Sequence, residues 1–210
     1  MDAVIRKGLE MLDSHGALLM VIIAALLILG LASCFLIEKR RFTTREVALM
    51  GMLVALNVVM AEVCKIVIIP NVLVLSLGFL PLALSGMLFG IVPTVTVAVI
   101  ADVIGALIFS SGSFYFGYTL TAFLTGLLFG AFLHRKPLRV IHVVVCQLLV
   151  SLICYAFLNS VWALNWVTKT AAEEYIGIRL AAQLGTFPVY TLMLLVMRRY
   201  RKTLEGALKR

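Results

Sequence analysis

Seven long apolar runs constrain this chain more than any other feature of its sequence. They cover residues 17–37, 47–69, 72–90, 92–110, 116–133, 140–160 and 178–197. A helix needs about 20 mostly apolar residues to cross a lipid bilayer. With 63% hydrophobic and 13% charged residues, the chain has more apolar surface than a soluble domain of 210 residues can bury. The sequence therefore predicts an all-α integral membrane protein and excludes the soluble classes.

The first run, residues 17–37, has two interpretations. A signal peptide is one, but this apolar stretch is long for a signal peptide, and the acidic residues Glu10 and Asp13 precede it. We favour a retained transmembrane helix. The basic residues Lys39, Arg40 and Arg41 separate this helix from the other six.

The basic residues gather on one side of the predicted spans. With seven spans, thirteen of the 18 Lys and Arg residues fall on one side of the membrane: at 39–45, in the loop at 135–139 or after residue 197. Cytoplasmic loops carry such an excess. The C-terminus is therefore predicted to be cytoplasmic and the N-terminus external. Topology thus explains the formal charge of +8, and no nucleic-acid partner is predicted.

Sequence signatures of common catalytic and metal sites are missing. The chain has no G-x-x-x-x-G-K-[ST] loop for ATP, no H-E-x-x-H and no G-x-S-x-G. Its four cysteines, Cys34, Cys64, Cys146 and Cys154, have no metal-ligand spacing, so neither a metal nor a cofactor is predicted. Glu173-Glu174 with Arg179 is one residue too widely spaced for a prenyl-protein peptidase signature. An intramembrane enzyme remains an alternative.

Asp102 is the most informative polar residue, because an ionisable group inside a membrane is by default a functional hypothesis. It adjoins a stripe of small residues, Thr94, Ala98, Ala101 and Gly105, that would allow another helix to approach closely. Asp102 is therefore predicted to face the interior of the bundle. It either makes a structural hydrogen bond to a neighbouring helix or accepts hydrogen bonds from a bound ligand.

Glu62 and Lys65 lie near the predicted outer end of the second run. Three residues apart on a helix, they can form an ion pair with each other or line the mouth of a binding site. An ideal helix would place Glu62 within about 20° of Gly51 and Ala55, which form a small-residue step nearer the cytoplasm.

The remaining candidates belong to the same outer half. Arg179 and Gln183 lie one helical turn apart at the start of the last run, where they either anchor the helix at the interface or bind an anionic ligand tail. Aromatic residues follow the fourth run: Phe114, Tyr115, Phe116 and Tyr118. They form either an interfacial belt or a stacking wall for a flat heteroaromatic ring. The sequence thus predicts an outward-facing binding pocket.

Three segments together resemble the substrate-binding S component of energy-coupling factor (ECF) vitamin transporters, in particular its folate-type branch. They are TTREVALMGMLVALNVVM, SLGFLPLALSGMLFG and ADVIGALIFSSGSFYFGYTLTAFLTGLLFGAF. Their marks include Gly78-Phe79-Leu80-Pro81, Ala101-Asp102 with Gly105, and Gly117 with Thr119-Leu120. The resemblance covers about residues 43–197, and the order and spacing of the segments make it specific.

The resemblance implies a six-helix bundle, here preceded by one extra N-terminal transmembrane helix. It divides the chain into an N-terminal extension (1–42), a substrate-binding membrane domain (43–200) and a basic cytoplasmic tail (201–210). It further implies capture of a vitamin at the outer face of a bacterial cell membrane. We predict separately that segment 66–77 acts as a lid over the pocket. Transport would require a transmembrane T subunit, which packs on Gly51 and Ala55, and two ATPase subunits.

One departure from the folate-type pattern affects the choice of vitamin. The position of Glu62 is commonly basic in that branch, and an acid there repels the carboxylates of folate. Lys65 and Arg179 could compensate. Folate or a related pterin is the first expectation, and a vitamin with a neutral or cationic tail is the alternative. A stand-alone secondary carrier is a further alternative, although the inverted repeats typical of such carriers are not visible.

Overall fold

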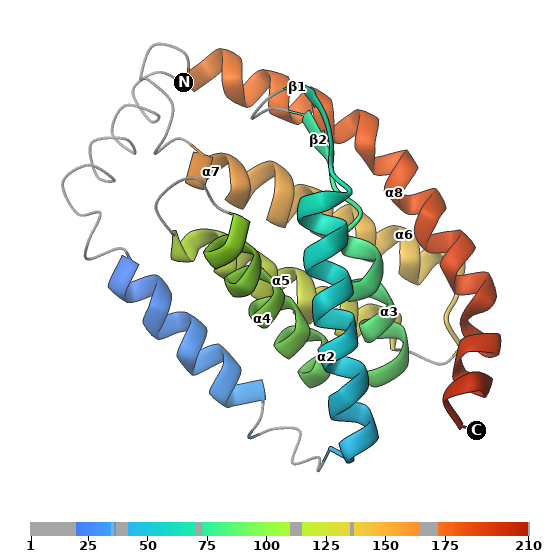
Figure 1. Ribbon diagram of the computed structural model, residues 1–210. Coiled ribbons are helices and arrows are strands. Elements are labelled where there is room, and N and C mark those ends of the chain that lie inside the picture. Colours follow the sequence, from blue (N-terminus) through green and yellow to red (C-terminus); the bar gives the residue numbers. More distant parts are fainter. Residues whose placement is uncertain are drawn as a thin grey trace.

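The computed structural model describes residues 20–34, 36, 42–69, 73–109, 115–134, 137–163 and 172–209, and most of them are helical (Figure 1). In chain order the elements are an N-terminal helix (Met20–Cys34), α2 (Thr44–Val58), the π-helix η1 (Val59–Val63), β1 (Ile66–Ile69), β2 (Leu73–Leu75), α3 (Phe79–Phe89), α4 (Ile91–Phe109), α5 (Phe116–Leu133), α6 (Val140–Leu149), the π-helix η2 (Val150–Leu158), α7 (Asn159–Ala163) and α8 (Ala172–Lys209). Within the described residues, five helical segments are long and apolar enough to cross a bilayer. The predicted all-α membrane class is therefore confirmed.

The prediction that residues 47–69 and 72–90 form two membrane-spanning helices is wrong where the two runs meet. Residues 66–69 and 73–75 form an antiparallel hairpin that pairs Ile66 with Leu75 and Val67 with Val74. Branched apolar residues favour extended backbone, and a short apolar run does not distinguish a strand from a helix. Consequently α3 has only 11 residues and reaches about 16 Å, roughly half of the hydrocarbon thickness. It packs against α2, α4, α5 and α8.

Small residues bring α4 and α5 into close contact. The predicted stripe Thr94, Ala98, Ala101 and Gly105 is buried along its whole length. From the opposite helix, a Cβ atom placed on Gly126 would lie 3.0 Å from the Cβ atom of Ala98. The stripe therefore faces the bundle interior, as the sequence predicts, and the two helices pack closely against each other.

Gly130 on α5 offers a direct test of this packing. A Cβ atom there would lie 2.5 Å from Cα of Ile91, which is backbone and cannot turn aside. Gly130→Ala should therefore destabilise the purified protein by about 1–3 kcal/mol, measured as thermal unfolding in detergent. Gly185→Ala is the control, because Gly185 on α8 has nothing within 4 Å and alanine favours helix. Equal unfolding midpoints for the two variants would contradict the packing.

The basic end of α8 is bound to the loop between α5 and α6. Nε of Arg198 donates to the carbonyl oxygen of Leu138 at 2.7 Å, and the Arg201 guanidinium donates to those of Leu133 and His134 at 3.4 Å. Carbonyls at a helix C-terminus lack intrahelical partners and favour such cations. The helix itself continues to Lys209, through most of the stretch expected to form a separate tail.

Candidate ligand-binding site

A cavity of about 530 Å³ lies among α2, α3, α4, α5 and η2. This volume falls in the range of about 300–1,000 Å³ that is typical of small-molecule sites. The polar side chains in its lining are those of Asn57, Glu62, Lys65, Ser76, Asp102, Tyr118, Thr121, Thr125, Tyr155 and Asn159. Alanines and glycines of α4 form much of the remaining wall, which leaves room for a flat molecule.

Asp102 lines this cavity, and its Oδ2 atom is buried. Within the part of the chain that the structure describes, Oδ2 makes no hydrogen bond of good geometry. The buried hydroxyl of Thr119 lies beside the carboxylate and interacts with it. A buried polar atom without a partner is costly, because it has lost its water without receiving a hydrogen bond in return. Asp102 therefore offers the cavity a hydrogen-bond acceptor whose capacity is only partly used.

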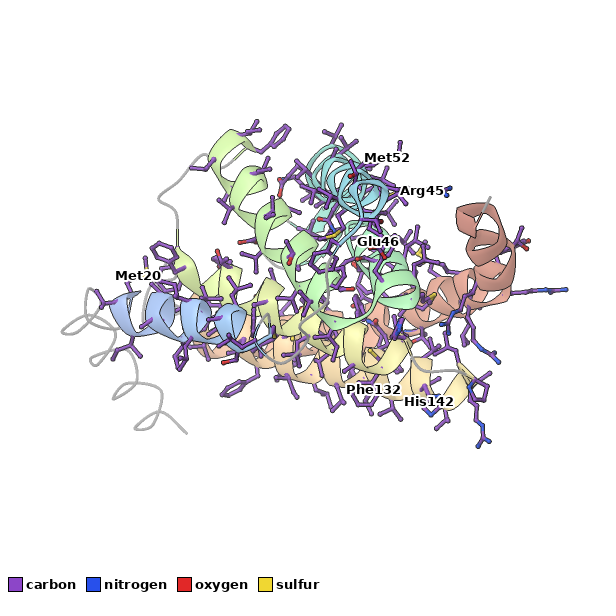
Figure 2. All side chains as sticks on the ribbon, turned by 90° about the horizontal axis from the view of Figure 1, so that it is seen from below. Met20, Arg45, Glu46, Met52, Phe132 and His142 are labelled. Carbon is purple, nitrogen blue, oxygen red and sulfur yellow. The ribbon has the colours of Figure 1, made fainter. Side chains whose placement is uncertain are left out.

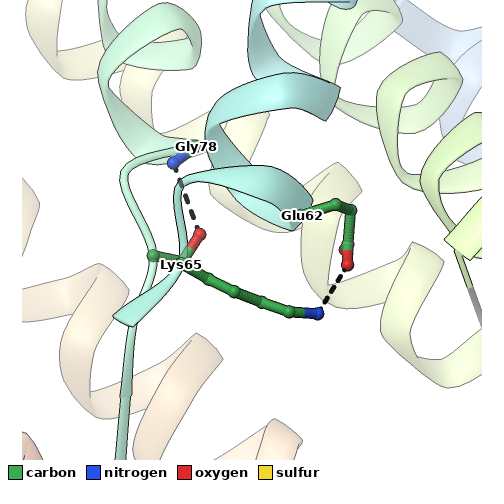
Figure 3. Close-up of polar contacts among 4 residues, drawn as sticks. Glu62, Lys65 and Gly78 are labelled. Atoms are coloured by element: carbon green, nitrogen blue, oxygen red, sulfur yellow. Dashed lines mark hydrogen bonds and ion pairs between the residues drawn. The ribbon is translucent and has the colours of Figure 1, made fainter. Parts of the chain in front are cut away.

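Glu62 and Lys65 form the ion pair that their spacing allows, and both also line the cavity (Figure 3). Nζ of Lys65 lies 2.8 Å from Oε2 of Glu62, and the two side chains are 42% and 28% exposed. Such a partly exposed pair contributes about 0–1 kcal/mol to stability. A ligand could therefore separate the pair at little cost.

The π-helix η1 determines where Glu62 points. An uninterrupted α-helix would turn Glu62 about 120° away from the buried Met50 and onto the exposed face of Gly51. In the structure the amide of Cys64 bonds to the carbonyl of Val59, five residues back, at 3.1 Å. This wider turn holds one extra residue and rotates Glu62 back toward the cavity. A Cβ atom on Gly105 would lie 3.7 Å from Cγ of Glu62, so α4 leaves space for this side chain.

The aromatic residues near the cavity have separate places. Tyr118 belongs to the lining. Tyr115 packs behind it against Trp162, with ring centroids 5.6 Å apart, and Phe116 is 39% exposed and outside the lining. Phe114 lies outside the described residues. Of the predicted aromatic wall, the structure therefore brings Tyr118 to the cavity.

Of the two predicted contact residues on α8, Gln183 is absent from the described lining of the cavity. Gln183 lies at the interface with η2, where its Oε1 atom accepts a hydrogen bond from Ser151 at 3.2 Å. Arg179 is part of α8, but its side chain lies outside the described part of the structure. On α2, Gly51 and Ala55 are exposed on the outside of the bundle, and nothing lies within 4 Å of a Cβ atom placed on Gly51.

Several lining residues were missed in the sequence. Asn57 and Asn159 are amides within apolar helices, and the same reasoning that selected Asp102 could have found them. Phe79 and Tyr155 give no such signal, because aromatic residues are common in any membrane helix. Their place depends on the short α3 and on the π-helix η2, which periodicity does not reveal.

The hairpin is tied to the bundle next to the cavity. The amide of Ser76 donates to Oη of Tyr190 at 3.2 Å, and the rings of Tyr190 and Phe79 lie 4.4 Å apart. Nδ2 of Asn57 donates to the carbonyl of Gly78 at 2.6 Å, and a Cβ atom on Gly78 would lie 2.7 Å from that of Ala61. The end of the hairpin is thus held by α2, α3 and α8 at the edge of the cavity.

Comparisons with known proteins agree with this architecture. The family model for the substrate-specific component of ECF transporters matches residues 45–201. The folate transporter FolT of Leuconostoc mesenteroides is 31% identical over 157 residues, covering 71% of this chain and 82% of that protein. FolT of Clostridium novyi is 29% identical over 120 residues, covering 57% and 69%. A crystal structure of FolT bound with folic acid has a TM-score of 0.68 and 29% identity, covering 75% of this chain and 94% of that one.

These relatives are transporter components and not enzymes. The match extends from the start of α2 into the C-terminal part of α8, which is most of the described chain. This protein therefore belongs to the family of ECF transporter substrate-specific components.

Proposed function

We propose that the protein is the substrate-binding subunit of an ECF-type ABC transporter and that it captures folate or a related pterin. The unpaired buried oxygen of Asp102 in a cavity of about 530 Å³ carries this proposal. Ring N–H groups of a pterin would donate to that carboxylate, and charge-assisted hydrogen bonds are strong in a site without water. The similarity to folate transporters supports the choice of ligand.

The rest of the cavity suits the other parts of such a ligand. Tyr118 and Phe79 lie in the lining and can pack against a planar ring. Lys65, whose side chain is 42% exposed, would exchange Glu62 for a ligand carboxylate. This exchange costs little, because the exposed pair is weak.

Partner subunits would supply the energy for import. The sequence has no phosphate-binding loop for ATP, and membership of the ECF family implies a T subunit and two ATPase subunits as partners. In the proposed orientation the basic end of the bundle is cytoplasmic, and so is the C-terminus. The C-terminal part of α8 lies at one end of the bundle, and Arg45 and His142 lie toward that same end. Met20 lies toward the opposite end of the bundle (Figure 2).

Glu62 favours a second candidate, a vitamin with a neutral or cationic tail. The described lining contains two carboxylates, Asp102 and Glu62, and the single cation Lys65. A cationic tail would bind Glu62 and leave Lys65 to solvent. The difference between the two candidates lies at the mouth of the cavity, not at Asp102.

Mass spectrometry of the ligand that survives purification tests both candidates. The protein is isolated in mild detergent, denatured, and its extract compared with that of the Asp102→Ala variant prepared in parallel. Folate or a pterin in near-equimolar amount, depleted in the variant, supports the first candidate, and a vitamin with a cationic tail supports the second. An extract without either class, together with no retention of added folate, would contradict the proposal.

The hairpin should control the release of the ligand. Tyr190→Phe removes the hydroxyl that binds the amide of Ser76, a contact worth about 0.5–1.5 kcal/mol. We expect ligand dissociation to be faster by about two- to tenfold, with little change in association, as measured by stopped-flow fluorescence. Tyr200→Phe is the matched control, because Tyr200 lies on the same helix and is 58% exposed. Equal dissociation rates for both variants would argue against the hairpin as a lid.

A further inference from the structure

The N-terminal helix (Met20–Cys34) lies outside the segment matched by the family model and packs on the bundle beside α4 and α5 (Figure 1). Its inward face is well defined. Ile23 and Leu27 are 4% and 6% exposed, whereas the neighbouring Leu26 is 52% exposed. At Gly30 the helix approaches α5 so closely that a Cβ atom would lie 2.8 Å from the ring of Phe123.

This inward face is continuous with residues that support the cavity. Ile23 and Leu27 form one buried cluster with Val95, Phe123 and Trp162. Nε1 of Trp162 donates to Oγ1 of Thr121 at 3.0 Å, and Thr121 lines the cavity.

Further contacts of the same tryptophan lead to a second lining residue. The Trp162 ring packs on Tyr115, and the Tyr115 ring meets that of Tyr118 edge to face at 6.2 Å. Tyr118 lines the cavity. Trp162 thus links the buried cluster of the N-terminal helix to two lining residues, to Thr121 directly and to Tyr118 by way of Tyr115.

We propose that the N-terminal helix is a positioning element of the ligand site. It presses on Phe123 and Trp162 from the outside and thereby holds Thr121 and Tyr118 in the geometry that binds the ligand. A wall that is already ordered before binding costs less ordering entropy at the moment of binding, so the helix raises affinity without touching the ligand. The inference rests on the proposed function, because it concerns the same cavity.

Adjacent leucines of the full-length protein provide a matched pair of variants. Leu27→Ala removes a buried side chain from the contact with the bundle, and Leu26→Ala removes an exposed one of the same size. Leu27→Ala should weaken folate affinity by about three- to tenfold, because the wall loses its support, and Leu26→Ala should leave it unchanged.

Two measurements on the ligand-free protein show whether the N-terminal helix holds the cavity wall in place. The emission of Trp162, measured with Trp166→Phe as background, should shift to longer wavelength in Leu27→Ala. Hydrogen exchange should become faster over the first turns of α5. A change in both readouts with unchanged folate affinity would overturn the proposal, and so would equal effects of the two leucine variants. If the wild-type protein does not bind folate, the proposed function fails, and these two readouts still decide whether the helix supports the wall.

A second pair of variants is needed in case Leu27→Ala does not displace the helix. It enlarges one side chain and shrinks the other at the closest contact between the helix and α5. Gly30→Leu collides with the Phe123 ring and should lower affinity and shift the Trp162 emission. Phe123→Ala, which opens the space, should restore part of both in the double variant. Wild-type affinity and emission in Gly30→Leu would overturn the inferred contact, and a double variant no better than Gly30→Leu alone would do the same.

Discussion

Asp102→Ala is expected to weaken folate binding by the purified protein at least tenfold, and up to about a hundredfold. The buried Oδ2 atom of Asp102 makes no hydrogen bond of good geometry with the described residues. A ligand can therefore donate a hydrogen bond to this atom without first breaking one inside the protein. Each hydrogen bond to a charged group contributes about 1.5–3 kcal/mol, and about 1.4 kcal/mol corresponds to a tenfold change in affinity. Isothermal titration calorimetry in detergent measures the change.

The control for this prediction lies on the same helix. Thr96→Val removes a hydroxyl that donates only to the carbonyl of Val92 in its own helix, and Thr96 is not in the cavity lining. Its folate affinity should equal that of the wild type. Asp102→Asn keeps the size of the side chain and removes its charge, so it separates the contribution of the charge from that of the shape. Wild-type affinity in both Asp102 variants would give Asp102 a structural role only.

Gly51→Leu is expected to abolish assembly with the T subunit and the ATPase subunits while folate binding by the isolated protein is unchanged. Gly51 is exposed on α2, and nothing lies within 4 Å of a Cβ atom there, so a leucine fits into the isolated bundle. Helices in membranes associate closely through small residues, and a protruding side chain at such a contact keeps the backbones apart. Co-purification of the tagged protein with its partner subunits, followed by folate uptake in cells, measures the effect.

Two variants control for the size of the new side chain. Gly51→Ala adds only a methyl group and should still assemble. Gly185→Leu makes the same change on α8, where the surroundings are equally open, and should also assemble. If Gly51→Leu assembles as well as Gly185→Leu, the exposed face of α2 is not the contact with the T subunit. If it loses folate binding instead, the side chain disturbs the cavity.

Parts of the fold that depend on composition and on a regular helical period could be predicted from the sequence. The observed α5 coincides with the predicted run 116–133, and α4 differs from its run by one residue at each end. The stripe ending at Gly105 is buried, and Asp102 beside it lines the cavity. Both results follow from the high cost of polar groups in lipid and from the close approach that small residues allow.

Local departures from the regular helix could not be predicted. The two strands of the hairpin, Ile66–Ile69 and Leu73–Leu75, consist of apolar residues that a membrane helix would also contain. The π-helix η1 inserts one residue into a turn and moves Glu62 from the predicted face of Gly51 and Ala55 to the cavity. No residue type specifies such a turn, because neighbouring helices decide whether it is stable. The polar residues predicted to line the outer end of the pocket are therefore found in different places. Lys65 lines the cavity, whereas Gln183 accepts a hydrogen bond from Ser151.

Titration of folic acid into the ligand-free, full-length protein in the absence of any partner subunit tests the central claim most directly. We expect saturable binding of one folate per chain, and a pterin without the glutamate tail should compete for the same site because Asp102 binds the ring. If neither compound binds, or if the free pterin and folate occupy separate sites, the cavity around Asp102 is not a pterin site and the account is contradicted.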